Sequence, residues 1–250
     1  ELLYGLMLSS GNDAAVALAI YCGGTVEGFA ELMNDKAHNL GLTGTHFENP
    51  NGLDSPGHYS TAKDLGTLAA YAMENPIFYK TVSAKNVKVG ERYLTNHNKL
   101  LWRVAGADGV KTGFTKAAGR ILVSSATRDG RRIIAVTIDD PSDWADHAAL
   151  MEEGFSRYAI QRVVNQGDRV GTVEVVGGEE RRVEVLAAED FDYSVAPEEH
   201  PCLALPGPGF VYAPAVEGAD AGVVYVLIEG KAVGKVPVVY GATIEQTQPE

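Results

Sequence analysis

The first third of the chain carries apolar residues at helical spacing. Residues 14–20 are apolar on nearly every side of a helix and are followed by Gly23-Gly24, which predicts a buried helix with a glycine stop. A second helix is predicted from Thr25, a capping residue, to Gly41, because apolar residues recur every three or four positions between them. We therefore expect the N-terminal region to be largely helical.

A long loop and a third helix follow. Residues 42–58 are rich in glycine, proline, asparagine and histidine, and an ordered loop of this length is often functional. A helix is predicted to begin at Ser60 or Thr61 and to end at Asn75-Pro76. Its inner face is expected to consist of Leu65, Leu68, Ala69, Ala72 and Met73.

The pattern then changes from helix to strand. Two apolar runs, residues 121–127 and 133–138, flank a turn at Asp129-Gly130 and predict a β-hairpin. Ser142 is expected to cap a last helix, which continues to about residue 158. Helical periodicity ends there.

The remainder of the chain is predicted to be all-β. Short Val-rich segments, among them residues 170–176, 182–186 and 223–228, are separated by glycine turns and indicate a sandwich or barrel. The Pro-rich segment 197–214 is expected to be a long connection. The change of pattern predicts two domains, residues 1–158 and 159–250.

Composition and charge exclude several classes of protein. The chain is 45% hydrophobic and 22% charged, so it can form a core and is not disordered or fibrous. Its net charge of −12 repels phosphate backbones, and nucleic acid is not an expected partner. The two cysteines lack metal-binding or redox spacing, and we expect neither a metal nor another cofactor.

Lys111-Thr112-Gly113, just before the hairpin, offers three groups that acyl transfer uses. The lysine places a cation near a nucleophile, the threonine hydroxyl can bind a substrate carboxylate, and glycine leaves room for a substrate backbone. The same tripeptide also fits an ordinary turn before a strand. His97, which lies upstream in a polar turn, is interpreted as a structural hydrogen-bonding residue rather than a base.

Ser10-Gly11-Asn12 is a second candidate. A hydroxyl and an amide two residues apart can point into one cleft, where the serine relays a proton and the asparagine holds a substrate carbonyl or a lysine. The alternative is that Ser10 or Asn12 simply caps the following helix.

Ser60 and Lys63 have the Ser-x-x-Lys spacing that places a nucleophile and its base on one helical face. In the alternative interpretation Ser60 or Thr61 caps the helix, Asp64 completes a capping box with Thr61, and Lys63 is solvated. The order of the motifs favours this alternative.

Together these motifs resemble the D-alanyl-D-alanine carboxypeptidases. These are the low-molecular-mass penicillin-binding proteins, serine peptidases that trim the peptidoglycan stem pentapeptide. The resemblance covers about residues 1–158 and continues into a β-domain. It implies an α/β (α+β) fold, a penicillin-binding or β-lactamase-like transpeptidase domain with an antiparallel sheet and helices, followed by a smaller all-β domain. The residues that carry it are Ser10-Gly11-Asn12, Asn51 to Asp54, His58 to Ala62, Asp108 to Thr115 and Ala118-Gly119.

The resemblance implies a role for each motif residue. Ser10 would help to shuttle a proton and Asn12 would bind a substrate amide. Lys111 would act electrostatically on the proton relay. Thr112 would bind the carboxylate of the terminal D-alanine, with Thr115 a weaker candidate.

Two further roles concern the strand that would bind the substrate. Gly113 would leave space for the substrate, and the backbone N–H of Phe114 would form one arm of the oxyanion hole. Some relatives place a carboxylate-binding arginine after the hairpin, where this chain reads Asp143-Trp144-Ala145-Asp146-His147. The identity of the carboxylate-binding residue is therefore left open.

In the family, Ser-x-x-Lys precedes Ser-x-Asn, whereas here the only such pattern follows it. Residues 1–8 also have the composition of a buried helix interior. We therefore expect the nucleophilic serine and its lysine on a segment that precedes Glu1.

With that segment, the resemblance implies an extracytoplasmic enzyme of the cell envelope, anchored to the membrane through a segment beyond Glu250. It would form an acyl-enzyme with D-Ala-D-Ala stem peptides, release D-alanine and be acylated by β-lactams. One alternative is a catalytically silent peptidoglycan-binding or scaffold protein. Another is a serine β-lactamase, which would need a base for rapid deacylation and which the added β-domain disfavours.

Overall fold

The computed structural model describes residues 1–207 and 209–248, which divide into two units, Glu1–Phe155 and Ser156–Glu250. The sequence places the boundary slightly later, between residues 158 and 159. Each unit is described by itself.

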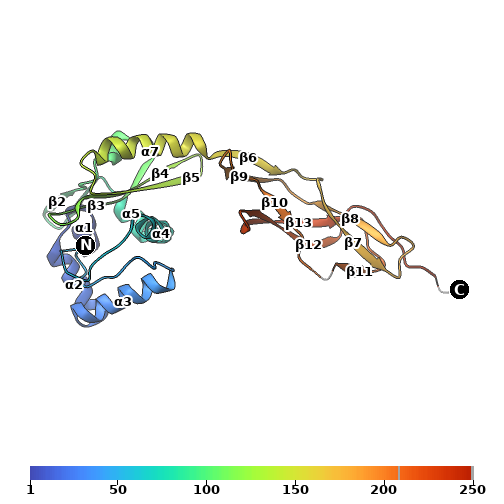
Figure 1. Ribbon diagram of the computed structural model, residues 1–250, viewed down its shortest axis with the longest axis horizontal. Helices are drawn as coiled ribbons and strands as arrows, with labels where there is room; N and C mark the ends of the chain where they lie inside the picture. The colour runs from blue at the N-terminus through green and yellow to red at the C-terminus, as the bar shows by residue number, and fades with distance from the viewer. Residues whose placement is uncertain (208, 249–250) are drawn as a thin grey trace. The chain divides into compact units, whose positions relative to one another are not determined.

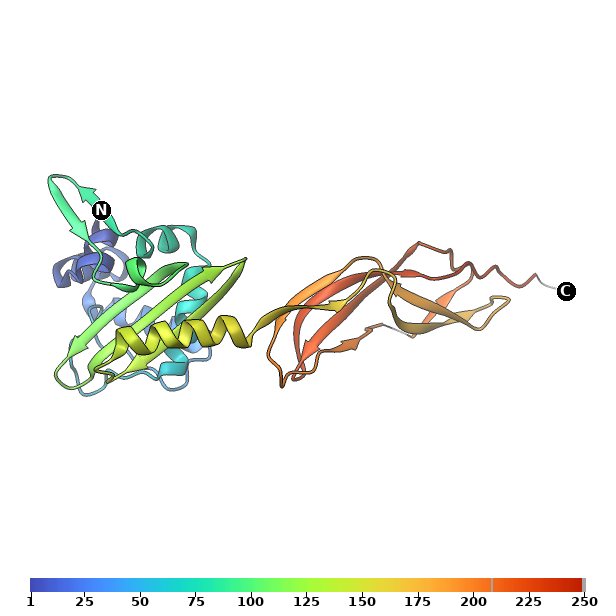
Figure 2. The same ribbon diagram turned by 90° about the horizontal axis from the view of Figure 1, so that it is seen from above.

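A three-stranded antiparallel sheet lies at the centre of the first unit, in the order β3 (Ala107–Thr115), β4 (Gly119–Arg128) and β5 (Arg131–Ile138). The middle of β4 is buried on both faces, which is why its sequence does not alternate, and its two buried serines, Ser124 and Ser125, are hydrogen-bonded to His147 and Asp108. Helix α7 (Asp143–Arg157) covers one face of the sheet, and α4 (Ala62–Met73) lies on the opposite side (Figures 1 and 2).

The predicted hairpin and last helix are confirmed. β4 and β5 pair up to Arg128 and Arg131, and the turn residues Asp129 and Gly130 have φ of 49° and 76°, as a two-residue primed turn requires. Met151 and Phe155 of α7 pack on the sheet through its apolar stripe.

The N-terminal helices differ from the prediction in burial. Helices α1 (Leu2–Ser9), α2 (Asn12–Gly23) and α3 (Val26–Asn39) are present, and Thr25 Oγ1 caps α3 by accepting from the Gly28 N–H. Within the described residues α2 is buried on one side only, against α1 and α3, and Ile20 of the predicted buried run is 51% exposed.

No single helix in the described part of the chain is long and apolar enough to cross a membrane. Helices α2 and α3 reach that length and apolar composition only when they are taken together, and a bend of 79° separates them.

Helix α4 and the loop before it are joined by one buried carboxylate. Thr61 caps α4 by accepting from the Asp64 N–H at 3.1 Å, as predicted. The Asp64 side chain does not complete a capping box with Thr61; it accepts from the Gly44 N–H at 2.8 Å and the Thr45 hydroxyl at 2.7 Å. The buried Asp64 therefore fixes the loop, predicted as residues 42–58, against the helix.

Several elements of the first unit are not predicted by the sequence patterns. They are α5 (Pro76–Val82), β1 (Asn86–Val89), β2 (Arg92–Thr95), α6 (Leu100–Arg103) and β3. Asn75-Pro76, interpreted as the end of a helix, also starts the next one: Asn75 Oδ1 accepts from two backbone N–H groups of α5, and proline is favourable at the first helical position.

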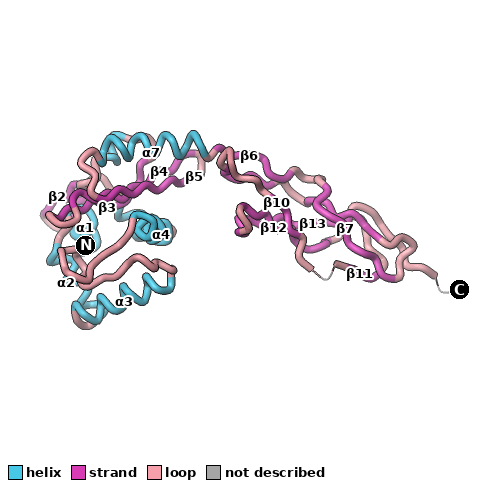
Figure 3. Tube along the Cα trace, viewed as in Figure 1, coloured by secondary structure: helices cyan, strands magenta, loops and turns pink. Residues whose placement is uncertain are grey.

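The second unit consists of strands and loops (Figure 3), which confirms the all-β prediction. A two-stranded sheet pairs β6 (Ala159–Val164) with β9 (Phe191–Val195). A six-stranded sheet has the order β10 (Cys202–Ala204), β12 (Asp220–Ile228), β13 (Lys231–Tyr240), β8 (Arg182–Ala187), β7 (Arg169–Val176) and β11 (Phe210–Tyr212). The prediction that residues 197–214 form only a connection is wrong, because this segment contains β10 and β11, each too short to give a periodic signal.

The second unit has its own hydrophobic core. Its largest cluster is formed by alternate residues of neighbouring strands, including Val185, Val224, Val226, Val236 and Val238. Residues 159–250 expressed alone are therefore expected to fold and to give a dispersed amide NMR spectrum. A collapsed spectrum in a segment that remains soluble would contradict this expectation.

Candidate active site

A cleft of about 1330 Å³ lies beside β3 in the first unit. Its walls come from the α1–α2 junction, β3, the loop before α4 and the first residues of α7. All the residues proposed from the two motifs line it, namely Ser10, Asn12, Lys111, Thr112, Gly113, Phe114 and Thr115. The fold thus brings together motifs that are about a hundred residues apart in sequence.

Ser10 has an unusual backbone conformation. It ends α1 in the left-handed region, with φ 54° and ψ 41°, which is uncommon for a residue with a side chain. The N-cap of α2 is Gly11, and no side chain caps that helix. The interpretation of Ser10 or Asn12 as an ordinary cap is therefore wrong, and the strained conformation of Ser10 favours a functional role.

Lys111 connects the two motifs. Its Nζ donates to Ser10 Oγ at 2.5 Å and to the Thr112 carbonyl at 2.7 Å. Burial lowers the pKa of Lys111 from 10.5 to about 8, because the protein environment solvates the ammonium less well than water does. The ammonium is thus directed at the Ser10 hydroxyl and is held close to its point of deprotonation.

The strand that carries Lys111 has an open edge. Among the described strands, β3 pairs only with β4, so its other edge is available to an extended ligand. A Cβ added at Gly113 would lie no nearer than 3.7 Å to the rest of the chain, an ordinary contact. The packing of this chain therefore does not require glycine there, and the space beside it is free.

The predicted residues at the end of β3 differ in their surroundings. Phe114 is 70% exposed at the cleft. Thr115 Oγ1 accepts from the Ala118 N–H at 3.0 Å and so stabilises the turn into β4. The Thr112 hydroxyl makes no hydrogen bond with any described residue, which leaves it available to a ligand.

Buried polar groups hold the start of β3, and sequence reasoning missed them. Asn98 Nδ2 donates to the Gly109 carbonyl at 2.7 Å, and the buried Asp108 accepts from the hydroxyls of Ser125 and Thr127. The sequence feature that could have indicated them is the pair of asparagines, Asn96 and Asn98, that flank His97. His97 itself is exposed at the cleft, and its backbone N–H donates to the Leu8 carbonyl.

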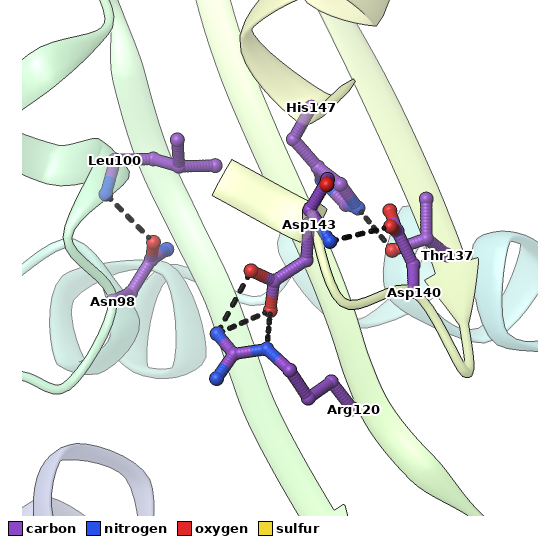
Figure 4. Close-up of polar contacts among 8 residues, drawn as sticks. Asn98, Leu100, Arg120, Thr137, Asp140, Asp143 and His147 are labelled. Atoms are coloured by element: carbon purple, nitrogen blue, oxygen red, sulfur yellow. Dashed lines mark hydrogen bonds and ion pairs between the residues drawn. The ribbon is translucent and has the colours of Figure 1, made fainter. Parts of the chain in front are cut away.

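Arg120 and Asp143 form a pair at the cleft that was also missed (Figure 4). Arg120 Nε donates to Asp143 Oδ2 at 3.1 Å, and Nη2 lies 2.8 Å from both carboxylate oxygens. The segment after the hairpin thus supplies an aspartate that binds an arginine of β4.

His147, next to this pair, fixes α7 to the sheet (Figure 4). Its Nδ1 lies 2.5 Å from Ser124 Oγ on β4, and its Nε2 lies 3.0 Å from Thr137 Oγ1 on β5. Burial lowers the pKa of His147, although Asp143 and Asp140 act in the opposite direction. The ring is therefore neutral at pH 7 and serves as a hydrogen-bonding link.

The Ser60-x-x-Lys63 pattern lacks the geometry of a nucleophile and its base. Ser60 precedes the N-cap Thr61, so the two residues do not share a helical face. Ser60 Oγ lies 2.9 Å from Thr45 Oγ1, and Lys63 is exposed. The prediction that this segment is simply a helix start is confirmed.

The cleft is more positive than the chain as a whole. Its lining contains three cationic side chains and two carboxylates, whereas the chain carries a net charge of −12. The charged residues are Lys99, Lys111, Arg120, Asp54 and Asp143. In the part of the chain that the structure describes, no three His, Cys, Asp or Glu side chains are placed to hold a metal ion. The cleft is suited to an anionic organic ligand.

Two family models match this chain. Residues 1–142 match the D-alanyl-D-alanine carboxypeptidase family, and residues 158–246 match the C-terminal domain of penicillin-binding protein 5. The D-alanyl-D-alanine carboxypeptidase DacD of Escherichia coli K12 is 37% identical over 76% of this chain and 50% of its own length. DacA of Haemophilus influenzae is 32% identical over 94% of this chain and 59% of its own length. The chain therefore spans 50–59% of the length of these two relatives.

Solved structures agree with these matches. Penicillin-binding protein 5 from Haemophilus influenzae matches with a TM-score of 0.69 at 29% identity. The match covers 98% of this chain and 74% of that one. Penicillin-binding protein D2 from Listeria monocytogenes, in a cefotaxime-bound form, has a TM-score of 0.58 at 34% identity; the match covers 62% of this chain and 65% of that one. The fold, the Ser10–Lys111 contact at the cleft and these matches lead to one conclusion: the chain belongs to the D-alanyl-D-alanine carboxypeptidase family.

Proposed function

We propose that this chain carries the substrate-binding part of a serine-type D-Ala-D-Ala carboxypeptidase, which removes the terminal D-alanine of peptidoglycan stem peptides through an acyl-enzyme. The observation that carries the proposal is the hydrogen bond from Lys111 Nζ to Ser10 Oγ beside an open strand edge. A partly buried cation directed at a hydroxyl suits a proton relay in acyl transfer.

In this proposal the substrate lies along β3. Its backbone pairs with the open edge, Gly113 leaves room for it, and Asn12 binds a substrate amide. The Thr112 hydroxyl binds the terminal carboxylate, with Thr115 in a lesser role because its oxygen already serves the turn. The Phe114 N–H donates to the oxyanion that develops on the scissile carbonyl.

Ser10 and Lys111 serve the proton transfers. The Lys111 ammonium lowers the energy of negative charge on the relay and on the oxyanion, and Ser10 passes a proton to the departing D-alanine amine. The nucleophilic serine and its lysine base stay a prediction, on a segment of the protein that precedes Glu1. The order of the motifs and the surroundings of Ser60 and Lys63 support that placement.

Acylation by β-lactams is part of the same proposal, because such a compound would present its carbonyl to the same oxyanion-binding groups. We also propose an extracytoplasmic location with a membrane anchor beyond Glu250, where the peptidoglycan substrate is found. The cefotaxime-bound relative supports the β-lactam reaction.

The full-length protein is expected to react with a fluorescent penicillin at a single serine in a segment before Glu1. Intact mass and peptide mapping of the labelled protein locate the adduct. A label on Ser60 would contradict the proposed nucleophile, and a protein that takes up no label would favour the silent peptidoglycan-binding alternative. Rapid release of the penicilloyl group would favour the β-lactamase alternative.

A further inference from the structure

Arg120 and Thr112 lie on the same face of the sheet at the cleft. In the β3–β4 register, Thr112 is opposite Leu122 and Phe114 is opposite Arg120. Because alternate side chains point to one face, Arg120 is the diagonal neighbour of Thr112, a separation that a long side chain can span. Both residues line the cleft.

Asp143 engages one edge of the Arg120 guanidinium and leaves the other open. Asp143 is bound through Nε and Nη2, and its side chain is only 4% exposed, compared with 41% for that of Arg120. Nη1 has no hydrogen-bond partner among the described residues. A guanidinium has five N–H donors in a planar fork, so a second carboxylate can bind the Nη1–Nη2 edge.

Further contacts restrict the Arg120 side chain and add positive charge beside it. The Arg120 guanidinium lies 5.8 Å from the centroid of the Trp144 ring, and Lys99 Nζ lies 5.9 Å from the same ring. Such cation–π contacts orient both cations. Asp143 and, less closely, Asp140 act on the Arg120 charge, so an anion is favoured here by the open guanidinium edge rather than by an excess of positive charge.

We propose that Arg120, oriented by Asp143, binds the C-terminal carboxylate of the peptide substrate together with the Thr112 hydroxyl. The inference rests on the proposed carboxypeptidase function. In this chain the segment after the hairpin has an aspartate and no arginine at its start, and the guanidinium comes from β4 instead. Arg120 would then set the preference for a free chain end, and Asp143 is its positioning residue.

The test compares two substrates in the full-length protein: diacetyl-Lys-D-Ala-D-Ala as the free acid and as the C-terminal amide. The parent should prefer the acid, since only the acid pairs with the guanidinium. Arg120→Gln is expected to lower kcat/KM for the acid about 30- to 100-fold, as for loss of a bidentate charged contact, and to change the amide rate less than about threefold. Asp143→Asn should shift the acid-to-amide ratio in the same direction by a smaller factor.

The chain provides a matched control in Arg128. This residue also lies on β4 and binds a carboxylate of α7 in bidentate fashion, with Nη1 at 2.9 Å and Nη2 at 2.5 Å from the oxygens of Glu152. It does not line the cleft, so Arg128→Gln should leave the acid-to-amide ratio unchanged. The double variant Arg120→Gln/Asp143→Asn avoids an unpaired buried carboxylate and keeps the test valid if the single variant fails to fold.

An unchanged acid-to-amide ratio in folded Arg120→Gln, or in the double variant, would overturn the proposal. If the parent cleaves neither peptide, the proposed carboxypeptidase function fails, and Arg120 is judged by binding alone. Calorimetric titration with acetyl-D-Ala-D-Ala and its amide then gives the result: the parent should bind the acid at least tenfold more tightly than the double variant does. Equal affinities would refute the role of Arg120.

Discussion

Lys111→Ala is expected to slow acylation by at least about a hundredfold without loss of the fold. A preorganised charge at a developing oxyanion contributes about 3–4 kcal/mol to barrier lowering, or two to three decades in rate. The measurements are the acylation rate with a fluorescent penicillin and thermal melting of the full-length protein. Lys116→Ala, on the neighbouring exposed turn and outside the cleft lining, is the control and should behave as the parent.

The lowered pKa of Lys111 also predicts how Lys111→Ala changes thermal stability and how the acylation rate of the parent depends on pH. With a pKa of about 8 in the folded state and 10.5 in the unfolded state, Lys111 is charged in both states below pH 8. The unfolded state binds more protons between those values, so stability rises with pH there, and the buried charge costs at most about 3 kcal/mol at pH 7. Lys111→Ala should therefore melt at the same temperature as the parent or above it. Normal acylation in this variant would refute the catalytic role. The acylation rate of the parent should also decline above pH 8, where Lys111 loses its charge, and a rate that stays constant there would refute the role as well.

Gly113→Ala is expected to lower kcat/KM for the peptide substrate about ten- to a hundredfold while leaving stability unchanged or slightly higher. The added methyl group makes only ordinary contacts with this chain, near Ile121, but it would occupy the space where a substrate backbone approaches β3. Replacing glycine by alanine in an unstrained position usually stabilises a protein by about 0.4–1 kcal/mol. Peptide hydrolysis and chemical denaturation separate the two effects.

The control for this variant is Gly66→Ala on α4. A Cβ there would also meet its nearest neighbour, Val136 Cγ2, at 3.7 Å, yet Gly66 does not line the cleft. Its substrate kinetics should match those of the parent. Full peptide turnover by Gly113→Ala would show that the substrate does not approach β3 at this position.

Elements with a clear periodicity were predictable from the sequence, and those formed by tertiary contacts were not. The β4–β5 hairpin carries two apolar runs around an Asp-Gly turn, α7 carries a period of three to four residues, and both are present. β3 contains Asp108, Gly109 and Gly113, which disfavour strands, and it forms because β4 pairs with it and Asn98 holds its carbonyl. The two strands of residues 202–212 are too short to show any period.

The residues of the candidate site also fall into those that the sequence could indicate and those that it could not. Ser10 and Lys111 could be identified because each lies in a short motif whose chemistry is recognisable in isolation. Arg120 could not, since its position at the cleft depends on the β3–β4 register and on Asp143, which is 23 residues away on another element. No local pattern in the sequence encodes such a relation.

The edges of the two main sheets differ in a way that affects self-association. In the second unit the six-stranded sheet ends in β10 and β11, each only three residues long, and short edge strands offer little backbone for another chain to pair with. In the first unit, in contrast, the edge strands β3 and β5 are nine and eight residues long, and each has an open edge among the described strands. The edge that makes β3 suitable for an extended peptide also makes it a template for the wrong strand. Lys111 and Gly113 within that edge oppose such pairing, because charge and poor strand propensity both disfavour the stacking of a second copy. We therefore expect the same two residues that serve the substrate also to disfavour pairing of a second copy at the β3 edge.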